Sequence, residues 1–349
     1  MTMTEIEVLG GGIFGLSVAF ECLRRGAKVR LIEKRATGAG SSGGVVGALA
    51  PHTPDNWNDK KQFQYESLVA MEAYWAEVDG LSGGHAGYAR TGRLVAIPDA
   101  RQLELAEARI ASAQKFWHGF AEWSVVPDSA VTGLAPQSAT GFLSHDTLSA
   151  RISPRAACAS LADAFTALGG EIVLGQNAGR GADAQIICTG YEGLLELGKT
   201  LGQPVGKGVK GQGLLLEHDA RSRPQVFAEG VHFIPHENGT LAIGSTTEID
   251  WQDASATDAQ LDDLYARAIG ICPILHGAKL LERWAGVRPR GRRRAPILGP
   301  YPGRPGVYVA NGGFKIGFGV AIRVGEVMAD LVLNGNAAIP ESFTIEANL

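Results

Sequence analysis

The sequence predicts an α/β protein in which a doubly wound domain is interrupted by a second, α+β domain with an antiparallel sheet. Three observations predict this class. The chain opens with a strand, a glycine-rich turn, a helix and a second strand over residues 5–34. It closes with a strand, a glycine-rich loop and a helix over 307–335. Between them, residues 205–250 alternate short apolar runs with turn residues, a pattern typical of an antiparallel sheet.

The opening unit is a βαβ motif of about 30 residues. EIEVL (5–9) is rich in strand-forming residues, and an amphipathic helix is expected over 14–25. Gly26 is expected to end that helix, and KVRLIEK (28–34) forms the next strand.

The following segments are assigned from periodicity and from helix-capping residues. Helices are expected over 60–79, 100–123 and 257–271, and a strand over 92–98. Ser153 and Pro154 suit the N-cap and first turn of a helix over 153–170. Strands are expected over 171–175 and 183–190, the second being apolar enough for a buried parallel strand. We therefore expect one domain from 1–80, 150–204 and 285–349, and another from 81–149 and 205–284.

Composition excludes several classes of protein. Hydrophobic residues make up 45% and charged residues 19% of the 349 residues, which are values of a globular chain. The formal net charge of −4 offers no general basic field for nucleic acid. The four cysteines are widely separated, which predicts reduced thiols in a cytoplasmic protein and no metal site. No run reaches the ~20 apolar residues of a membrane span.

The glycine-rich turn carries a dinucleotide fingerprint. Gly10, Gly12 and Gly15 follow a strand and open a helix, as in Rossmann-like domains. Gly10 allows the tight turn, Gly12 lets a pyrophosphate approach, and Gly15 lets the helix pack against the strand. Glu33 at the end of the second strand suits both ribose hydroxyls and would repel a 2′-phosphate. The motif alone does not distinguish NAD from FAD.

Several motifs in order resemble the D-amino acid oxidase superfamily of FAD-dependent oxidoreductases, and most closely its glycine oxidase and sarcosine oxidase branch. These motifs are GGGIFGLS, SSGGVVGALAP, DAQIICTG, WAGVRP and VYVANGGFKIGFGVAIRVGEVMADLVLNG. The resemblance spans roughly residues 5–335. It implies a non-covalently bound FAD and the oxidation of a C–N bond by hydride transfer to flavin N5. The product would be an imine that hydrolyses to a 2-oxo acid.

The resemblance also implies which residues contact the cofactor. Those near the nucleotide half are Gly10, Gly12, Ile13, Phe14, Gly15, Glu33, Lys34, Arg35, Ser41, Ser42, Val173, Thr189 and Gly190. Those near the flavin ring are Gly47, Ala48, Leu49, Gly313, Phe314, Lys315, Ile316 and Gly317.

Four residues are candidates for the chemistry. Arg288 stands in WAGVRP, where the family commonly holds a substrate carboxylate, and a guanidinium fork matches that group. Lys315 in the last glycine loop could approach both substrate and flavin, whose ring gains negative charge on reduction. His232 replaces a tyrosine common in relatives and could gain charge at mildly acid pH. His52 follows the flavin-contacting stretch.

Two departures from the family leave alternatives open. Relatives carry a small β-meander where this chain has only QNAGRGA (176–182), so the adenine side could be more open. The loop RGRRR (290–294) is either solvated or an electropositive entrance for a doubly anionic substrate or an acidic partner. The expected substrate is a small anionic amino acid or amine. The alternatives are a 2-hydroxy-acid dehydrogenase, with His232 or His52 as base, and a flavin-binding subunit of a hetero-oligomeric amine dehydrogenase. A homo-oligomer or a partner subunit is compatible with the sequence.

Overall fold

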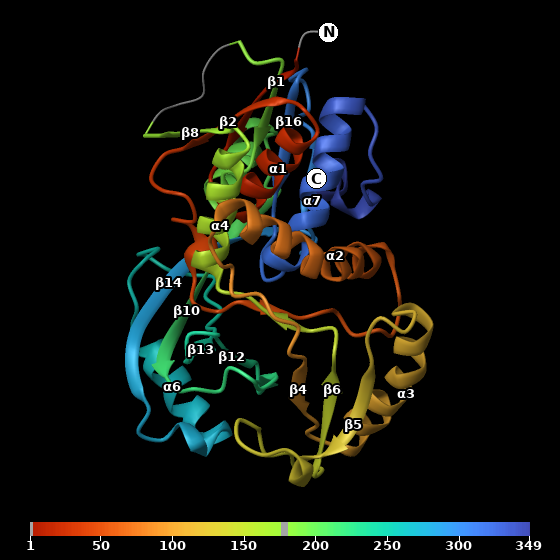
Figure 1. Cartoon of the computed structure of the whole chain (residues 1–349), viewed down its shortest axis with the longest axis vertical. Helices are drawn as coiled ribbons and strands as arrows, with labels where there is room; N and C mark the ends of the chain where they lie inside the picture. The colour runs from red at the N-terminus through yellow and green to blue at the C-terminus, as the bar shows by residue number, and fades with distance from the viewer. Residues whose placement is uncertain (1–2, 176–180) are drawn as a thin grey trace.

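The computed structural model describes residues 3–175 and 181–349 of the chain. It consists of two parts, each built on one large sheet (Figure 1). The upper part in this view holds a six-stranded sheet in the order β15-β16-β9-β1-β2-β8, and the lower part an eight-stranded sheet in the order β14-β10-β13-β12-β11-β4-β6-β5. The predicted fold class is confirmed, whereas the exact domain boundaries stay an expectation.

The six-stranded sheet is parallel from β8 to β16, and β15 pairs antiparallel at its edge. Its strands are β1 (Glu5–Leu9), β2 (Lys28–Glu33), β8 (Glu171–Leu174), β9 (Ala184–Ile187), β15 (Ile297–Pro300) and β16 (Val307–Asn311). Val8 and Ile186 are paired and fully buried, as the apolar runs predict. Because β1 and β2 are parallel, their carboxyl ends lie at the same end of the sheet, and the glycine turn follows β1 there.

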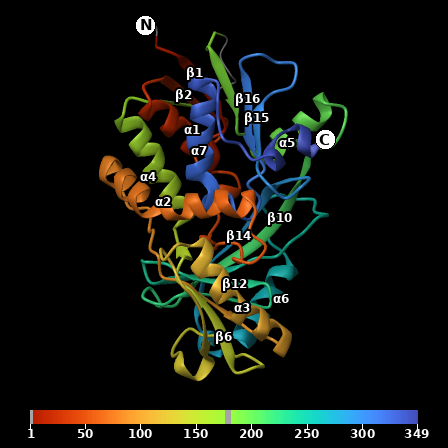
Figure 2. The same cartoon turned by 90° about the vertical axis from the view of Figure 1, so that its right-hand side faces the viewer.

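Helices cover this sheet and reach the junction of the two parts (Figure 2). They are α1 (Ile13–Arg24), α4 (Pro154–Ala167), α5 (Gly190–Thr200) and α7 (Gly317–Asn334). Helix α2 (Asp59–Ser82) lies across the junction in both views. Gly26 has a φ of +87°, so it ends α1 as expected.

The eight-stranded sheet is antiparallel except where β11 pairs with β4. Its strands are β4 (Arg93–Ala96), β5 (Trp123–Pro127), β6 (Phe142–Asp146), β10 (Gly206–Glu217), β11 (Gln225–Ala228), β12 (Val231–Pro235), β13 (Thr240–Gly244) and β14 (Lys279–Gly291). Helices α3 (Ala100–Phe116) and α6 (Ala259–Ile271) flank it, and β3 (Ala48–Leu49) and β7 (Ala150–Arg151) form a separate two-stranded ribbon.

The largest difference from the predicted helix boundaries is at the end of α3. The helix expected over 100–123 ends at Phe116, because His118 and Gly119 both take a positive φ and Trp123 begins β5. Within residues 3–175 and 181–349, no helix has both the length and the apolar character that crossing a membrane requires. The segment QNAGRGA (176–182) is predicted to replace a β-meander. Residues 176–180 of it lie outside the described residues.

Candidate functional site

The glycine turn brings β1, β9 and α1 into direct contact. A Cβ on Gly15 would lie 1.8 Å from the Gly10 carbonyl oxygen, and a Cβ on Gly10 would lie 2.5 Å from the Cys188 oxygen. Gly10 also has a φ of +102°, which L side chains rarely adopt. These contacts explain why the turn requires glycine, and they place the start of α1 at the carboxyl end of β1.

Glu33 and Ser42 each accept a hydrogen bond from a backbone amide of this turn. The Gly11 and Arg35 amides donate to the Glu33 carboxylate at 2.7 and 2.9 Å, which holds it at the end of β2. The Ile13 amide donates to Ser42 Oγ at 3.0 Å, although Gly12, the N-cap of α1, has no side-chain cap of its own. A Cβ on Gly12 would lie 3.1 Å from Ser42 Oγ, so glycine keeps a narrow cradle open.

The other residues predicted at the nucleotide half lie around this cradle. Lys34 and Arg35 are exposed after β2, whereas Phe14 is buried in α1. Val173 on β8 is paired with Ile32 beside Glu33. Thr189 is the N-cap of α5, and Gly190 begins that helix. Ser41 and Ser42 belong to a 3-10 turn (Ser41–Gly43) that leads to β3.

The segment 44–49 enters the junction between the two parts of the molecule. Gly47 is required because a Cβ there would lie 1.7 Å from the Ile152 oxygen. Ala48 and Leu49 form β3, and Val46 packs over Gly213 and Gly244 of the large sheet. The predicted flavin-contacting segment therefore lies directly against the second sheet.

The C-terminal glycine loop reaches the same junction. A Cβ on Gly313 would lie 2.9 Å from the ring of Phe14, so this loop packs at the start of α1. Ile316 is the N-cap of α7 and Gly317 its first residue, with no acidic residue in the first turn and no side-chain cap. The start of α7 therefore offers backbone N–H groups and a positive dipole end to a ligand.

Strand register places a row of glycines on the sheet face that meets these loops. His232 is paired with Gly244, Gly244 with Gly213, and Gly213 with Trp284. Paired residues point to the same face, and so do alternate residues along a strand. The same face of β14 therefore carries Trp284, Gly286, Arg288 and Arg290.

Gly211, Gly213, Gly244 and Gly286 share this face, which we call the glycine floor, and Arg288 lies against it. A Cβ on Gly211 would lie 1.7 Å from Nη2 of Arg288, so the guanidinium occupies the space that a side chain on Gly211 would take. Arg288 Nη2 donates to Ser245 Oγ at 2.7 Å and to the Thr246 carbonyl at 3.3 Å. Burial lowers the pKa of Arg288 to about 10, so it remains charged at neutral pH. In the part of the chain that the structure describes, it forms no ion pair.

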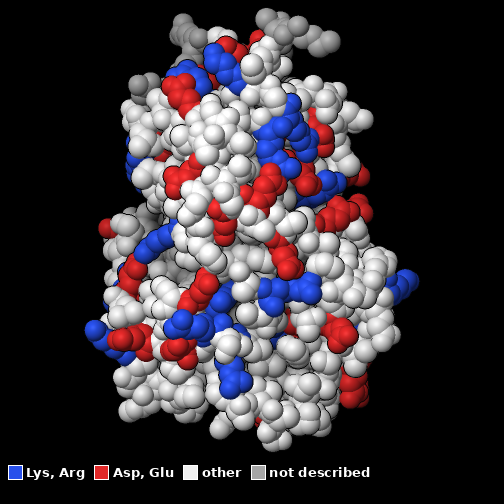
Figure 3. Space-filling view, viewed as in Figure 1, with Lys and Arg blue, Asp and Glu red and all other residues white. Residues whose placement is uncertain are grey.

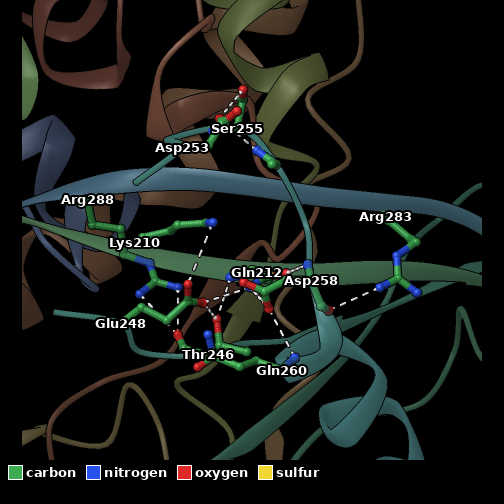
Figure 4. A network of polar contacts seen from close by, with 11 residues as sticks. Lys210, Gln212, Thr246, Glu248, Asp253, Ser255, Asp258, Gln260, Arg283 and Arg288 are labelled. Atoms are coloured by element: carbon green, nitrogen blue, oxygen red, sulfur yellow. Dashed lines mark hydrogen bonds and ion pairs between the residues drawn. The ribbon is translucent and has the colours of Figure 1, made fainter. Parts of the chain in front are cut away.

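A polar network lies behind Arg288, beside the opposite face of β10 (Figure 4). Glu248 accepts a hydrogen bond from Thr246 Oγ1 and another from Gln212 Nε2 at 3.0 Å. Lys210 Nζ lies 3.7 Å from the Glu248 carboxylate, and both side chains are only 4% exposed. This network fixes Thr246, whose carbonyl accepts from Arg288, and the charge of Glu248 favours the protonated guanidinium.

Lys315 approaches Arg288 from the C-terminal loop. The Phe314 amide donates to the Pro289 carbonyl at 3.0 Å, which ties the loop to β14 next to Arg288. Lys315 Nζ donates to Thr247 Oγ1 at 3.1 Å, beside the Ser245 and Thr246 partners of Arg288. Lys315 is exposed as a residue, but partial desolvation of its ammonium, and then the charges of Arg288 and Arg294, lower its pKa.

The arginine-rich loop is more than a solvated surface segment. Arg292 donates to the backbone of Leu349, and Arg293 to that of Ala347, so these two hold the C-terminal residues. The Arg290 guanidinium lies 5.7 Å from the centroid of the Phe314 ring. The Arg294 carbonyl accepts from Lys60 Nζ at 2.6 Å.

His232 is in the same site but does not carry the charge that the sequence suggested. Its Nδ1 is buried and has no hydrogen-bond partner among the described residues. Burial, and then the charges of Arg93, Lys315 and Arg288, lower the pKa of His232 to about 3. The expectation that it gains charge at mildly acid pH is therefore wrong. Its free ring nitrogen can serve as a hydrogen-bond partner for a ligand.

His52 lies on the loop before α2 rather than on the glycine floor. Its amide donates to Gln64 Oε1 at 2.9 Å, and its Nδ1 also contacts that oxygen. Burial lowers the pKa of His52, with a smaller contribution from Arg93. Arg93 is the group whose charge acts on both histidines, and its Nε donates to Asp146 at 3.0 Å.

Sequence reasoning missed the groups that shape this site. They are Arg93, the glycines at 211, 213, 244 and 286, and the Ser245–Thr247 segment with Glu248 and Lys210. The usable signals were GKGVKGQG (206–213), whose glycines are unusual inside a strand, and GSTTE (244–248) directly after one.

Filling the space over Gly211 is expected to displace Arg288. We expect Gly211→Ala to raise KM and to lower kcat/KM by roughly ten- to hundredfold, because small displacements of a positioning group are costly. The guanidinium is the flexible end of its side chain and can move, so the melting temperature should change little. Steady-state kinetics with a melting curve check this, and unchanged kcat/KM would show that the present Arg288 position is not required.

The low pKa of His232 predicts a pH-dependent stability. In the unfolded chain His232 takes up a proton near pH 6.5, whereas in the folded protein it does so only near pH 3. Wild-type stability relative to His232→Gln should therefore fall as pH falls below about 6.5, by up to about 1.4 kcal/mol per pH unit. Urea unfolding of both proteins at pH 5, 6 and 7 measures this, and a difference independent of pH contradicts it.

The fold defines a class of two-part α/β proteins in which a Rossmann-like sheet with its glycine turn meets a separate, largely antiparallel sheet. The model of the family described as "DAO: FAD dependent oxidoreductase" matches residues 5–331, and the chain belongs to this family.

Named relatives are similar along the whole chain. The chain is 27% identical over 379 residues to glycine oxidase of Pseudomonas putida, covering 99% of both proteins. It is 28% identical over 360 residues to glycine oxidase of Pseudomonas aeruginosa, covering 94% of both. Among solved structures, glycine oxidase of Geobacillus kaustophilus superposes with a TM-score of 0.86 at 21% identity, covering 98% of this chain and 99% of that one.

The family is named for FAD, and the residues present fit that cofactor. The cradle at Gly12 is open only because no Cβ fills it, and Glu33 has remaining lone pairs for ribose hydroxyls. The four cysteines are buried, and burial raises the pKa of Cys22, Cys158 and Cys272 to about 12. Thiols so held are poor nucleophiles, which favours a non-covalent cofactor.

Proposed function

We propose that this enzyme oxidises the C–N bond of a small amino acid or of a secondary amine that carries a carboxylate. The observation that supports this most directly is Arg288, a half-buried guanidinium on a glycine floor with only neutral hydrogen-bond partners. A planar fork with free donors matches a carboxylate in two parallel bonds.

Each group in the site has a definite task in this proposal. FAD, held by the residues around Gly12, Glu33 and the α7 start, supplies the two-electron acceptor at flavin N5. Arg288 binds the substrate carboxylate and orients the Cα–H bond toward the junction. The neutral ring of His232 accepts a hydrogen bond from the substrate nitrogen.

The overall reaction balances without a protein nucleophile. The substrate loses a hydride from carbon and a proton from nitrogen, which gives an imine. Water then adds to the imine carbon, and the C–N bond breaks to give a 2-oxo acid and ammonia, or an amine from a secondary amine. The two electrons leave through the cofactor to an external acceptor such as oxygen or a quinone.

The experiment is an anaerobic titration of the purified holoenzyme, followed by its visible absorption. Glycine, sarcosine and D- and L-alanine are compared with the matched hydroxy acids glycolate and D- and L-lactate. Bleaching by an amino acid, with a 2-oxo acid as product, supports the proposal. Bleaching by hydroxy acids alone contradicts it and favours the hydroxy-acid alternative.

Two further readouts separate the remaining alternatives. Aerobic and quinone-coupled turnover by the isolated chain would exclude a subunit that is inactive without a partner. Acid precipitation should release the yellow cofactor into the supernatant if it is bound non-covalently. Cofactor that stays with the precipitate would contradict that part of the proposal.

A further inference from the structure

The site holds more positive charge than one carboxylate can balance. Within residues 3–175 and 181–349, five basic side chains around the C-terminal glycine loop form no ion pair. They are Lys60, Arg288, Arg290, Arg294 and Lys315. Their contacts are neutral: Lys60 donates to a backbone carbonyl, Arg288 to Ser245 Oγ and Thr246 O, and Lys315 to Thr247 Oγ1, while Arg290 lies over the Phe314 ring.

Two of these cations lie beside one short segment, residues 245–247, which follows strand β13 of the large sheet. Arg288 donates to Ser245 and Thr246, and Lys315 donates to the next residue, Thr247. The hydrogen bond from the Phe314 amide to the Pro289 carbonyl joins the two chain segments that carry these cations. The two cationic groups therefore contact neighbouring residues of the 245–247 segment.

Lys315 is directed to the segment that follows β13 and holds the partners of Arg288. Its ammonium lies 3.1 Å from Thr247 Oγ1 in that segment. The start of α7 has neither an acidic residue nor a side-chain cap, so its own N–H groups can meet negative charge on the cofactor. Lys315 is therefore available for a second anionic group on the substrate.

The excess of positive charge is local to the site. The protein as a whole has a formal charge of −4, and Lys and Arg alternate with Asp and Glu on the face shown in Figure 3. Desolvation, and after it the repulsion by neighbouring arginines, lowers the pKa values of Lys60 and Lys315. Uncompensated cations with perturbed pKa values are typical of a binding site that waits for an anion.

We propose that the preferred substrate is an amino dicarboxylate, with Arg288 holding the carboxylate next to the reacting carbon and Lys315 holding the second carboxylate. This inference rests on the proposed function. Arg290, Arg294 and Lys60 form the positive surroundings of the second carboxylate. Aspartate and glutamate are the simplest members of this class.

The test compares substrates that differ only by the second carboxylate. Anaerobic titration and steady-state kinetics are run with D- and L-aspartate, D- and L-glutamate, D- and L-alanine and glycine. Wild type is compared with Lys315→Gln and with the control Lys279→Gln, which removes one charge from an exposed lysine on β14. We expect aspartate or glutamate to exceed alanine in kcat/KM by about tenfold or more. Lys315→Gln should remove most of that preference, and Lys279→Gln should leave it in place.

A binding readout that does not depend on turnover completes the design. Succinate and malonate should raise the melting temperature of the holoenzyme more than propionate and acetate do, because a ligand of the folded state stabilises it according to its affinity. Lys315→Gln should abolish the difference between the two kinds of acid.

The outcomes separate this inference from the proposed function. If alanine or glycine reduces the cofactor and the dicarboxylates do not, the inference is wrong and amine oxidation stands. If neither these amino acids nor the secondary amine sarcosine reduces the cofactor, both are wrong. A dicarboxylate preference that Lys315→Gln leaves intact would also overturn the inference, because the second carboxylate would then be held elsewhere.

Discussion

Replacing Arg288 with methionine is expected to lower kcat/KM by a factor of roughly 10² to 10⁴, because two charge-assisted hydrogen bonds to the substrate carboxylate contribute about 3–5 kcal/mol. Most of the loss should appear in KM if the carboxylate bonds are equally strong in the ground and transition states, and in kcat if Arg288 chiefly orients the reacting carbon. Steady-state kinetics on the best substrate measure both.

The same change should not unfold the protein. Arg288 is a half-buried cation without an ion-pair partner among the described residues, and partial burial lowers its pKa to about 10. A buried charge costs folding free energy, so the methionine variant should be as stable as wild type or more so. Loss of activity with a retained melting temperature and cofactor content would assign Arg288 to binding rather than to folding.

Two matched variants sharpen this result. Arg288→Lys keeps the charge but loses the planar fork, and should recover only part of the activity. Arg267→Met makes the same chemical change on the exposed face of α6 and should leave activity intact. Equal activity of Arg288→Met and wild type would remove the main support for the proposed function.

The opening βαβ unit could be predicted because all of its signals are local. The glycine spacing, the helix end at Gly26 and the acidic end of the second strand lie within about one motif's length. The structure bears these out, since Glu33 reaches back to the Gly11 amide and Gly10 takes a positive φ. Structural constraints between residues that are close in the chain can be recognised directly in the sequence.

Strand β14 and helix α5 show why other elements were missed. Pro289 and the glycines of β14 disfavour an interior strand, but β14 is the first strand of its sheet, and an edge position tolerates proline. Helix α5 begins at Gly190 and contains Gly193 and Gly198, so its intrinsic helix propensity is low. It is stabilised by burial of Leu194 and Leu197, which only the tertiary structure supplies.

The candidate site could be predicted only in part, for the same reason. Arg288 and Lys315 were identified by resemblance, and nothing in their neighbourhood in the sequence points to Ser245 or Glu248, some 40 residues before Arg288. The glycine floor depends on strand register, because a slip by one residue would turn these glycines to the other face. The low pKa of His232 arises first from burial and then from the charges of Arg93, Lys315 and Arg288, which three separate chain segments bring together.

Replacing Gly15 with alanine is expected to abolish retention of FAD and to destabilise the protein by several kcal/mol. A Cβ at Gly15 would lie 1.8 Å from the Gly10 oxygen, so α1 and the glycine turn would have to move apart. Overpacking of a rigid backbone contact costs about 1–3 kcal/mol or more, and displacement of the turn also removes the cradle at Gly12. Absorbance at the flavin band relative to 280 nm, with and without added FAD, measures retention.

A second helical glycine provides the control for this experiment. A Cβ at Gly80 in α2 would meet no atom within 4 Å, so Gly80→Ala should stabilise the protein by about 1 kcal/mol through helix propensity alone. If Gly15→Ala lowers the free energy of unfolding and Gly80→Ala raises it, the cost at Gly15 comes from the contact with Gly10. It does not come from replacing a helical glycine as such. A Gly15→Ala protein that binds FAD as tightly as wild type would contradict the assignment of this turn to the cofactor.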